Sequence, residues 1–353
     1  MNFDLDESQE LFKDTVERFM KDVTVTERHR VRKMPGGFDP ARWKELADAG
    51  LIAVTASEAD GGIDGSQTDC AVVAQSLGQA LCFDPWLECG FLPAKLLAGT
   101  EYCAPVVAGE LLCAFAFAEP GQRYVLNAEM TTAKTTDGPA FLTGEKNFVL
   151  YGAIASHFIV TAKLDGKTEL FLLERGAQGV SVKEYPVADG GLAAVLSVHN
   201  SPAIALPGGE ERLHAAIDEA RLAASAEMVG ITQKLFDDTL EYVRTREQFG
   251  QPIGQFQVIQ HKMVDCYDKL EQMQSGLLRL LLVPAADRSG QIEGFKAMIG
   301  ENAHWIAHQA VQFHGGMGVS DDINIGHGLK RIILLSRLFG DPQSGYARFC
   351  KAA

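Results

Sequence analysis

Apolar side chains recur every three to four residues through the first third of the chain, which is the spacing of amphipathic helices. The first such stripe follows Asp6, a residue type that caps helices, and a second begins at Pro40, where a missing N–H costs nothing. Two further helices are predicted over 68–81 and 86–97. We therefore expect residues up to about 110 to be all-α.

The period changes from about residue 112. Short segments rich in β-branched and aromatic residues, separated by turn residues, predict strands over 112–118, 140–143, 148–150, 157–162, 169–173, 180–187 and 194–199. Asp165-Gly166 lies between two of them, and both residues tolerate the positive φ of a tight hairpin. We expect Pro202 and Pro207-Gly208-Gly209 to close the β region.

Helical spacing returns after about residue 210 and continues over three long stripes, with a last helix predicted over 326–338. Apolar stripes of this kind indicate core packing in a helical bundle. The sequence thus predicts an α+β fold with an N-terminal all-α domain over 1–111, a middle β domain over 112–209 and a C-terminal helical bundle over 210–353.

Composition narrows the classes of function. The 353 residues carry a formal net charge of −14, which argues against a nucleic-acid partner, since such partners are bound through clustered Lys and Arg. The N-terminal stretch Met1–Asp6 lacks the features of a secretory signal, and no apolar run is long enough to span a membrane. We expect a cytoplasmic protein without a membrane partner.

Cysteine and histidine usage indicates neither disulfides nor a metal site. The 7 cysteines form no C-x-x-C pair, which fits reduced thiols. His304 and His308 share a helix face, but no glutamate base lies between them and no third ligand is evident nearby. We expect no bound metal.

The stretch from Arg246 to Gln257 combines a guanidinium, an amide, aromatic rings and a Gly-Pro turn at the end of a long helix. Arginine suits bidentate contact with phosphate oxygens, and the amide of Gln248 can add a hydrogen bond to a diphosphate or ribose. A bound dinucleotide is one interpretation. The other is a polar corner between helices, formed by Gly250 and Pro252.

The order α, β, α with the motif Arg-x-Gln-Phe-Gly-x-Pro-Ile-x-x-Phe-Gln resembles the acyl-CoA dehydrogenase family over essentially the whole chain. Phe115–Pro120 stands where the family has Phe-Ala-x-Thr-Glu-Pro, and Gln312–Gly318 matches its Gln-x-x-Gly-Gly-x-Gly. The resemblance implies a β-sandwich or barrel-like middle domain and a C-terminal four-helix bundle. It also implies FAD held without a G-x-G-x-x-G motif, which this chain lacks after any predicted strand.

In that family two subunits share each FAD, and the bundle of one subunit holds the ADP half. Here the matching cofactor-binding positions are Arg246, Gln248, Phe249, Phe256, Gln257, Gln312, Gly315 and Gly316. Glycine at the last two positions lets the backbone come close to a ligand. The resemblance therefore implies an intact ADP-binding side.

The flavin-binding side departs from the family pattern. Ala118 replaces the threonine whose hydroxyl meets the flavin, and Phe148-Val149-Leu150 replaces Trp-Ile-Thr. Leu150 cannot donate the hydrogen bond that the threonine makes near N5. Phe339-Gly340-Asp341-Pro342 stands where the family has Tyr-Glu-Gly-Thr.

The glutamate lost at Gly340 is the family's catalytic base, which removes the α-proton while the β-hydrogen leaves as hydride. Some members place the base just before the arginine of the first bundle helix, but that pair is Ala220-Arg221 here, so only the arginine is kept. Asp341 and Glu219 each lie one residue out of register. Asp341 is a weak candidate for a base and Glu219 a weaker one, against the alternative of solvated surface acids.

Together these features imply the base-lacking subunit of a heterotetrameric (α2β2) acyl-CoA dehydrogenase that acts on sterol side-chain or other unusual acyl-CoA. A related partner subunit would supply the flavin pocket and the glutamate, and an electron-transferring flavoprotein would accept the electrons. Two alternatives stay open. One is a homo-oligomeric dehydrogenase that uses Asp341 as its base, and the other is a catalytically inactive acyl-CoA-binding or scaffold homologue.

Overall fold

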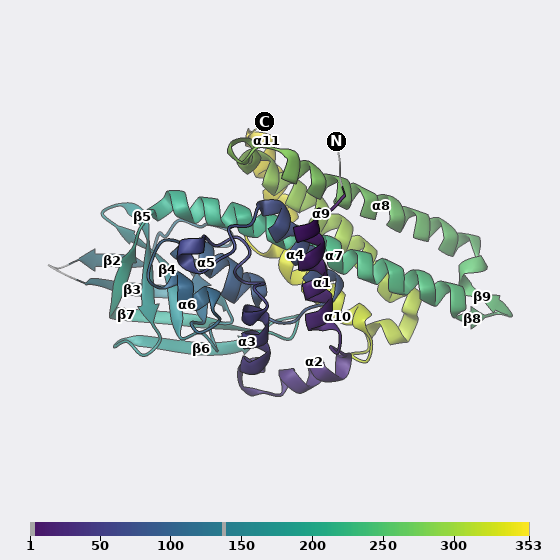
Figure 1. Ribbon diagram of the computed structural model, residues 1–353, viewed down its shortest axis with the longest axis horizontal. Coiled ribbons are helices and arrows are strands. Elements are labelled where there is room, and N and C mark those ends of the chain that lie inside the picture. The colour runs from purple at the N-terminus through teal and green to yellow at the C-terminus, as the bar shows by residue number, and fades with distance from the viewer. Residues whose placement is uncertain (1–3, 136–138, 353) are drawn as a thin grey trace. The chain divides into compact units, whose positions relative to one another are not determined.

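The structure, a computed structural model, describes residues 4–135 and 139–352 (Figure 1). Its N-terminal helices are α1 (Glu7–Met20), α2 (Val25–Arg32), α3 (Pro40–Asp48), α4 (Gln67–Gln79), α5 (Leu92–Leu97) and α6 (Cys103–Val107). A π-helical turn over Trp86–Phe91 leads into α5. The all-α prediction is confirmed for the described residues, but α2 and α6 were not predicted. The first has only Val25 and Val31 as apolar residues, and the second is little more than one turn long.

Sequence signals explain where two of these helices begin. Asp6 caps α1, because its Oδ1 accepts the Gln9 N–H at 2.9 Å while the Gln9 amide oxygen accepts the Asp6 N–H at 3.1 Å. Asp39 caps α3 by accepting the Ala41 N–H at 3.0 Å, and Pro40 occupies the first helical position. Both starting points agree with the sequence prediction.

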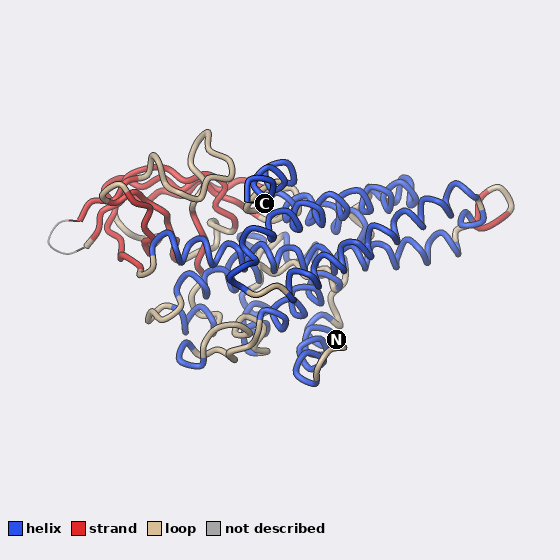
Figure 2. The backbone as a smooth tube through the Cα atoms, turned by 90° about the horizontal axis from the view of Figure 1, so that it is seen from above, coloured by secondary structure: helices blue, strands red, loops and turns tan. Residues whose placement is uncertain are grey.

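The middle region is a single closed sheet. Its strands are β1 (Cys113–Ala116), β2 (Thr132–Thr135), β3 (Ala140–Leu150), β4 (His157–Leu164), β5 (Lys167–Glu174), β6 (Val180–Pro186) and β7 (Leu192–Leu206). The order is β1-β4-β2-β3-β7-β5, with β6 on β7. Because β5 also pairs with β4, the sheet closes on itself into the barrel-like region drawn in red in Figure 2. Leu142, Phe158 and Phe171 belong to its buried core.

The hairpin prediction is confirmed, since Asp165 and Gly166 join β4 to β5 with φ values of +50° and +85°. Two predicted strand limits were wrong. Residues 140–150 form one strand with bulges, not two strands. Pro202 does not end the β region, because β7 continues to Leu206 with Pro202 opposite Phe141. A proline removes only its own N–H, so the ladder can continue on either side of it.

The C-terminal region contains α7 (Gly209–Thr245), α8 (Gln257–Leu282), α9 (Ala285–His314), α10 (Asn324–Arg337) and α11 (Pro342–Ala352). A short antiparallel pair, β8 (Glu247–Gln248) and β9 (Gln251–Pro252), joins α7 to α8. The four predicted helices are present, and α11 follows the one that was expected to be last. α9 packs against α8, α10 and α11, which makes it the central helix of this group.

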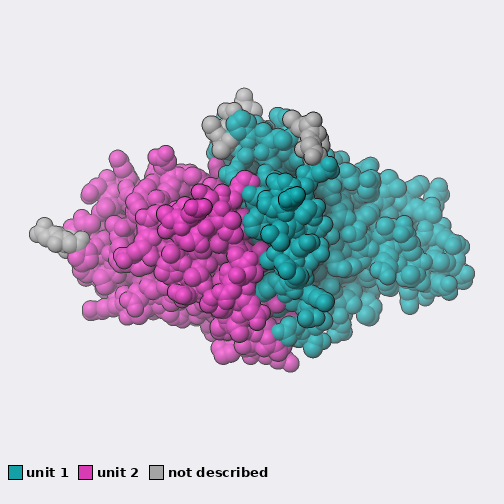
Figure 3. Space-filling view, viewed as in Figure 1, with its two compact units in different colours: residues 1–27, 67–83, 221–353 teal, residues 28–66, 84–220 magenta. Residues whose placement is uncertain are grey.

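The chain forms two compact units, coloured separately in Figure 3: residues 1–27, 67–83 and 221–353 make the first, and residues 28–66 and 84–220 the second. The N-terminal helices divide between them, with α1 and α4 in the first unit and α3, α5 and α6 in the second, while α2 passes from the first to the second at residue 28. The three-domain division at 111/112 and 209/210 stays a prediction. No helix in the described ranges is long and apolar enough to cross a membrane.

Candidate functional site

The stretch that follows α7 is a tight hairpin. The Arg246 N–H donates to the Tyr242 carbonyl at 2.8 Å, and the Arg246 carbonyl accepts the Ile253 N–H at 2.8 Å. Between these bonds β8 pairs with β9, and the two turn residues, Phe249 and Gly250, have φ values of +55° and +82°. Positive φ at both central positions is the geometry of a two-residue hairpin turn. The stretch is therefore a projecting hairpin.

The predicted cofactor-binding side chains of this hairpin face solvent. Arg246 and Gln248 are exposed, and Phe249 is 93% exposed with its ring edge-on to Phe256 at 6.1 Å. Among the described residues, no hydrogen bond or ion pair engages the Arg246 guanidinium. An exposed aromatic residue at positive φ adds nothing to the chain's own core. Such a set of groups is available to a molecule that binds from outside.

The end of α9 supplies the second predicted group. Gln312 is exposed, and Gly315 adopts φ +57° and ψ −136°, a conformation open only to glycine. Gly316 has neither a positive φ nor a neighbour within 4 Å of an added Cβ, so the chain's own packing does not require glycine there. Gly318 is different, because an added Cβ would lie 2.5 Å from the Val311 carbonyl oxygen. The surface at Gly316 thus leaves space that the chain itself does not use.

A stacked ring pair brings the two groups together. Tyr242, one turn before Arg246 on α7, stacks on His314 at the end of α9 with ring centroids 4.1 Å apart. The Nδ1–H of His314 donates to the Ala310 carbonyl at 2.8 Å, which fixes the ring on its helix. The sequence analysis did not assign this role to Tyr242. The only available signal was its position four residues before the arginine of the motif.

The remaining predicted ADP-side residues begin α8. Gln257 is its first residue and is exposed, while Phe256 precedes it and is half-buried beside the hairpin. The structure therefore places all eight predicted cofactor-binding residues in the first unit, on the hairpin, at the start of α8 and at the end of α9. Their role as cofactor ligands remains a proposal.

Three of the flavin-side positions lie in the second unit, and two of these are buried by the chain itself. Ala118 and Leu150 are buried, and Leu150 lies in β3 opposite Ala193 of β7. Phe148 has φ +55° and is 37% exposed. No side chain among these three residues carries a hydrogen-bond donor. They fit apolar packing and do not fit the hydrogen bonds that a flavin ring requires.

A buried ion pair holds the loop that follows Ala118. Glu119 accepts the N–H groups of Glu129, Met130 and Thr131 at 2.8–2.9 Å and the Lys146 ammonium at 2.9 Å. Although burial opposes its charged form, the N–H group of Met130, the Lys146 ammonium and the other two N–H groups lower the Glu119 pKa to about 2. Lys146 also donates to Phe117 O and Thr161 Oγ1. The loop is thus anchored by its own chain.

The two family base positions contain no acid or base. Ala220 is fully buried. Gly340 has φ +131°, and a Cβ added there would lie 2.5 Å from Arg348 Nη2. The retained Arg221 donates from Nε and Nη2 to the Phe339 carbonyl, at 3.1 and 2.9 Å, and forms an ion pair with Glu293 at 2.6 Å. Arg221 therefore fixes the turn that carries Gly340.

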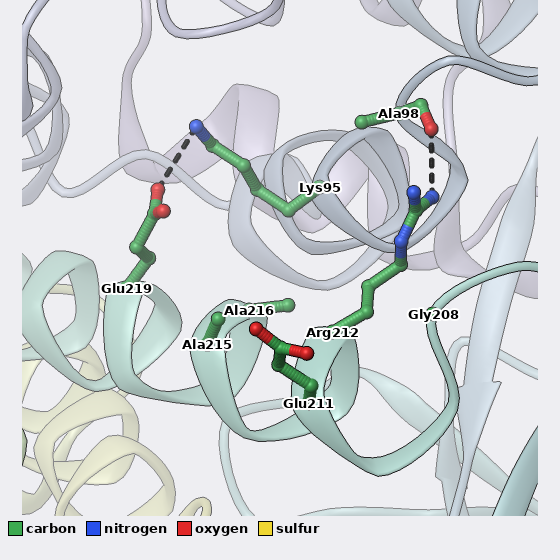
Figure 4. Close-up of a pocket in the computed structure, with 8 residues that line it drawn as sticks. All are labelled: Lys95, Ala98, Gly208, Glu211, Arg212, Ala215, Ala216 and Glu219. Atoms are coloured by element: carbon green, nitrogen blue, oxygen red, sulfur yellow. Dashed lines mark hydrogen bonds and ion pairs between the residues drawn. The ribbon is translucent and has the colours of Figure 1, made fainter.

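The two weak base candidates are held by other groups. Asp341 Oδ1 accepts the Ser344 N–H at 2.8 Å in the first turn of α11, as a capping residue does. Glu219 forms an ion pair with Lys95 at 2.9 Å (Figure 4). Both acids stay candidates, but each has a structural role in its own unit.

Glu219 also lines a cavity of about 470 Å³ between α5 and α7. At its other side Arg212 donates to the Ala98 carbonyl at 2.6 Å, as Figure 4 shows. The cavity residues are Lys95, Ala98, Gly208, Glu211, Arg212, Ala215, Ala216 and Glu219. The charged contacts at both ends of the cavity hold α5 against α7.

All seven cysteines are free thiols. His304 and His308 approach each other with Nε2 atoms 3.2 Å apart, and within the described residues no group of three His, Cys, Asp or Glu side chains could hold a metal ion.

Comparison with known proteins identifies the family of the chain. The model of the acyl-CoA dehydrogenase C-terminal domain matches residues 208–341, and that of the acyl-CoA dehydrogenase N-terminal domain matches residues 6–87. The chain is 28% identical to acyl-CoA dehydrogenase FadE27 of Mycobacterium tuberculosis over 96% of its length and 93% of that protein. It is 27% identical to the isovaleryl-CoA dehydrogenase of Arabidopsis thaliana mitochondria over 92% of its length and 86% of that protein.

Solved structures show the same fold. A variant of the Tcur3481-Tcur3483 steroid ACAD superposes with a TM-score of 0.89 at 27% identity, covering 98% of this chain and 97% of that chain. The ChsE4-ChsE5 complex from Mycobacterium tuberculosis gives a TM-score of 0.87 at 24% identity, covering 99% and 98%.

The fold and the two matching family models define the class as the flavin-dependent dehydrogenases. The chain belongs to the acyl-CoA dehydrogenase family, whose members are oxidoreductases that use FAD to oxidise a CH–CH bond of an acyl-CoA thioester.

Proposed function

We propose that this chain is the base-lacking subunit of a heteromeric acyl-CoA dehydrogenase, and that it binds the ADP half of an FAD whose flavin ring lies in a related partner subunit. The contrast between the two predicted half-sites carries the proposal. On the ADP side Arg246 and Gln248 are exposed, and Arg246 has no partner within the described chain. On the flavin side Ala118 and Leu150 are buried and apolar.

The residues of the ADP side suit a diphosphate and an adenosine. Arg246 supplies paired N–H donors for phosphate oxygens, and Gln248 adds an amide. Gly316 allows a ligand to approach the backbone closely, since nothing of this chain lies where its Cβ would be. The ring of Phe249, which is 93% exposed, offers a stacking surface.

When bound, FAD accepts the β-hydrogen of the acyl-CoA as hydride while a carboxylate removes the α-proton. This chain offers no carboxylate at Gly340 or Ala220, and its Arg221 is bonded to the Phe339 carbonyl and Glu293. The partner subunit is therefore the source of the base in this proposal. An electron-transferring flavoprotein is the proposed electron acceptor.

The substrate class comes from similarity. The Tcur3481-Tcur3483 protein, 27% identical to this chain, is a steroid ACAD. We extend that class to this chain as an acyl-CoA carrying a sterol side chain or another unusual acyl group. The cytoplasmic location stays a prediction.

Co-expression with a related dehydrogenase chain tests the proposal. The partner would be one that carries the Thr-Glu-Pro and catalytic Glu missing here, and the measurements would be FAD per chain and dehydrogenase activity. We expect FAD and activity only in the complex. Full flavin loading and activity of this chain alone would overturn the proposal.

A matched pair of arginine variants tests the ADP side by flavin content. Arg246→Ala removes charge-assisted hydrogen bonds to the diphosphate, so we expect FAD affinity of the complex to fall about ten- to hundredfold without unfolding. Arg244→Ala is the control, because Arg244 is also exposed and lies two residues earlier in the last turn of α7. Equal flavin content in both variants would show that the hairpin is only a polar corner.

A further inference from the structure

Lys296 of α9 is a buried lysine that the proposed cofactor site does not use. It is 3% exposed, and its Nζ donates to the Gly340 carbonyl at 2.9 Å and to the Ser336 carbonyl at 3.2 Å. These carbonyls lie at the end of α10 and in the turn that leads to α11. Lys296 therefore bonds α9 to the turn 339–341, where the family carries its catalytic base.

The charged groups that act on this amine come from three helices and from the turn. They are Arg221 of α7, Glu293 of α9, Asp341 of the turn and Arg348 of α11. Glu293 forms an ion pair with Arg221 at 2.6 Å and another with Arg348. Two guanidinium groups and two carboxylates balance each other, so a charged Lys296 adds an uncompensated positive charge to a buried cluster.

The same cluster holds α11 on α9. Arg348 and Glu293 link the two helices directly, and the helices pack closely through glycine. A Cβ on Gly345 would lie 2.7 Å from the Glu293 carbonyl oxygen, and one on Gly294 would lie 2.7 Å from the Phe349 ring. Because the contact is this close, charge imbalance at Glu293 and Arg348 acts on the docking of α11 as a whole.

We propose that Lys296 makes the docking of the 339–341 turn and α11 onto α9 depend on pH, with the docked form gaining stability as the pH rises above neutral. Burial, followed by the charges of Arg221 and Arg348, lowers the pKa of Lys296 from 10.5 to about 7. In the undocked form the amine is in water and regains its ordinary pKa.

The sign follows from proton binding. Between about pH 7 and 10.5 the undocked form holds a proton that the docked form has lost, so raising the pH favours docking by up to about tenfold per pH unit. Below about pH 7 both forms are protonated, and the equilibrium no longer changes with pH. Carboxylates and guanidinium groups ordinarily keep their charge across neutral pH, so this titration belongs to the amine.

Hydrogen exchange of the full chain at pH 6.5, 7.5 and 8.5 tests the proposal. Amides of residues 338–350 are followed, corrected for intrinsic exchange rates, with β4 as the internal reference. We expect the opening constant of this segment to fall on the order of tenfold between pH 6.5 and 8.5, while β4 shows no such trend. A flat profile for residues 338–350 would overturn the proposal.

Two variants test whether the pH dependence of docking comes from Lys296 and the charged groups around it. Lys296→Met keeps an apolar chain of similar length without a titrating group, and its profile is expected to be flat; a slope equal to that of the unmodified chain would refute the assignment. If Lys296→Met fails to fold, Arg348→Gln decides. Removing that cation raises the pKa of Lys296, so the pH dependence is expected to begin at higher pH. An unchanged profile in Arg348→Gln would contradict the proposed charge balance.

Discussion

At the end of α7, Arg246, Gln248 and Phe249 extend into solvent, whereas at the Gly340 turn the polar groups of the chain are bonded to one another. The hairpin holds an aromatic residue at positive φ that is 93% exposed, a feature that stabilises no core of its own. The turn has its carbonyls bonded to Arg221 and Lys296. One region leaves its polar and aromatic groups exposed, and the other bonds its polar groups within the chain.

The flavin-side positions of the second unit resemble the Gly340 turn, because their groups are buried or bonded within the chain. Ala118 and Leu150 are buried, and the nearby Glu119 and Lys146 pair with each other. The side chains of Ala118 and Leu150 need no hydrogen-bond partner, while the buried Thr131 Oγ1 beside the ion pair has none among the described residues. This difference teaches that replaced and retained family positions obey separate physical constraints within one chain, because the replaced ones named here are buried while the predicted cofactor-binding ones on the hairpin are exposed.

The largest expected effect tests whether the flavin-side loop is held by its own chain. Lys146→Met removes the ammonium that pairs with Glu119 and leaves a buried carboxylate, so we expect the free energy of unfolding to fall by about 3–5 kcal/mol. Urea denaturation followed by circular dichroism measures the change. Glu129→Gln is the control, because Glu129 is an exposed carboxylate in the same loop. A loss below about 1 kcal/mol for Lys146→Met would mean that this anchor is dispensable.

The same anchor predicts a direction of acid sensitivity. The pKa of Glu119 is lowered from 4.5 to about 2. A carboxyl with a depressed pKa stabilises the folded state above its unfolded pKa and loses that contribution as the pH falls towards the folded value. Stability should therefore decline between about pH 4.5 and 2. Glu119→Gln should show a shallower decline over this window when unfolding is measured at each pH.

A substitution at the Gly340 turn should lower the free energy of unfolding somewhat less than Lys146→Met does. Gly340→Glu puts the family's catalytic residue type at this position. The backbone there has φ +131°, and a Cβ would lie 2.5 Å from Arg348 Nη2. The backbone strain at this φ should lower stability by about 1–3 kcal/mol, while the Arg348 guanidinium, the end of a flexible side chain, can move aside. We expect no gain of dehydrogenase activity for the lone chain, measured with an artificial electron acceptor. Activity at normal stability would show that the turn is open to a catalytic side chain.

Two glycines at the end of α9 allow a test of ligand binding apart from packing, since Gly318 contacts the chain and Gly316 does not. Gly318→Ala places a Cβ 2.5 Å from the Val311 carbonyl oxygen, so stability should fall by about 1–3 kcal/mol. Gly316→Ala meets nothing within 4 Å in this chain and should change stability by less than about 0.5 kcal/mol. Only Gly316→Ala is expected to weaken FAD binding by the complex while the chain keeps its melting temperature. Normal FAD affinity in Gly316→Ala would place the ligand elsewhere.

Local signals in the sequence were sufficient for much of the fold. Asp6, Pro40 and Asp165-Gly166 act through bonds and dihedral angles within a few residues, so their helix starts and hairpin could be predicted. The ends of the strands were harder to predict from the sequence. The bulges in β3 and the passage of β7 through Pro202 depend on the paired strand, which a single segment does not specify.

The candidate site also has a part that local sequence predicts and a part that it does not. The residues of the hairpin are contiguous in sequence, so Arg246, Gln248 and Phe249 could be proposed together. The contact of Lys296 with Gly340 joins residues 44 positions apart, and the stacking of Tyr242 on His314 joins two different helices. No spacing rule predicts such pairs, because they depend on how α9 packs against its neighbours. The charge cluster around Lys296 was therefore visible only in the structure.

The smallest expected effect distinguishes the heteromeric proposal from a homo-oligomeric enzyme that uses Asp341. Asp341→Asn keeps a side-chain oxygen that can accept the Ser344 N–H, which Asp341 Oδ1 accepts at 2.8 Å, so the cap of α11 is kept. Any loss of stability should come from the removed charge, which acts on Lys296. It removes the only group by which Asp341 could act as a base. We expect the activity of the co-expressed complex, measured as electron-acceptor reduction with an acyl-CoA, to stay within about twofold, a change worth roughly 0.4 kcal/mol. A fall of a hundredfold or more at unchanged stability would make Asp341 the base and this chain a catalytic subunit in its own right.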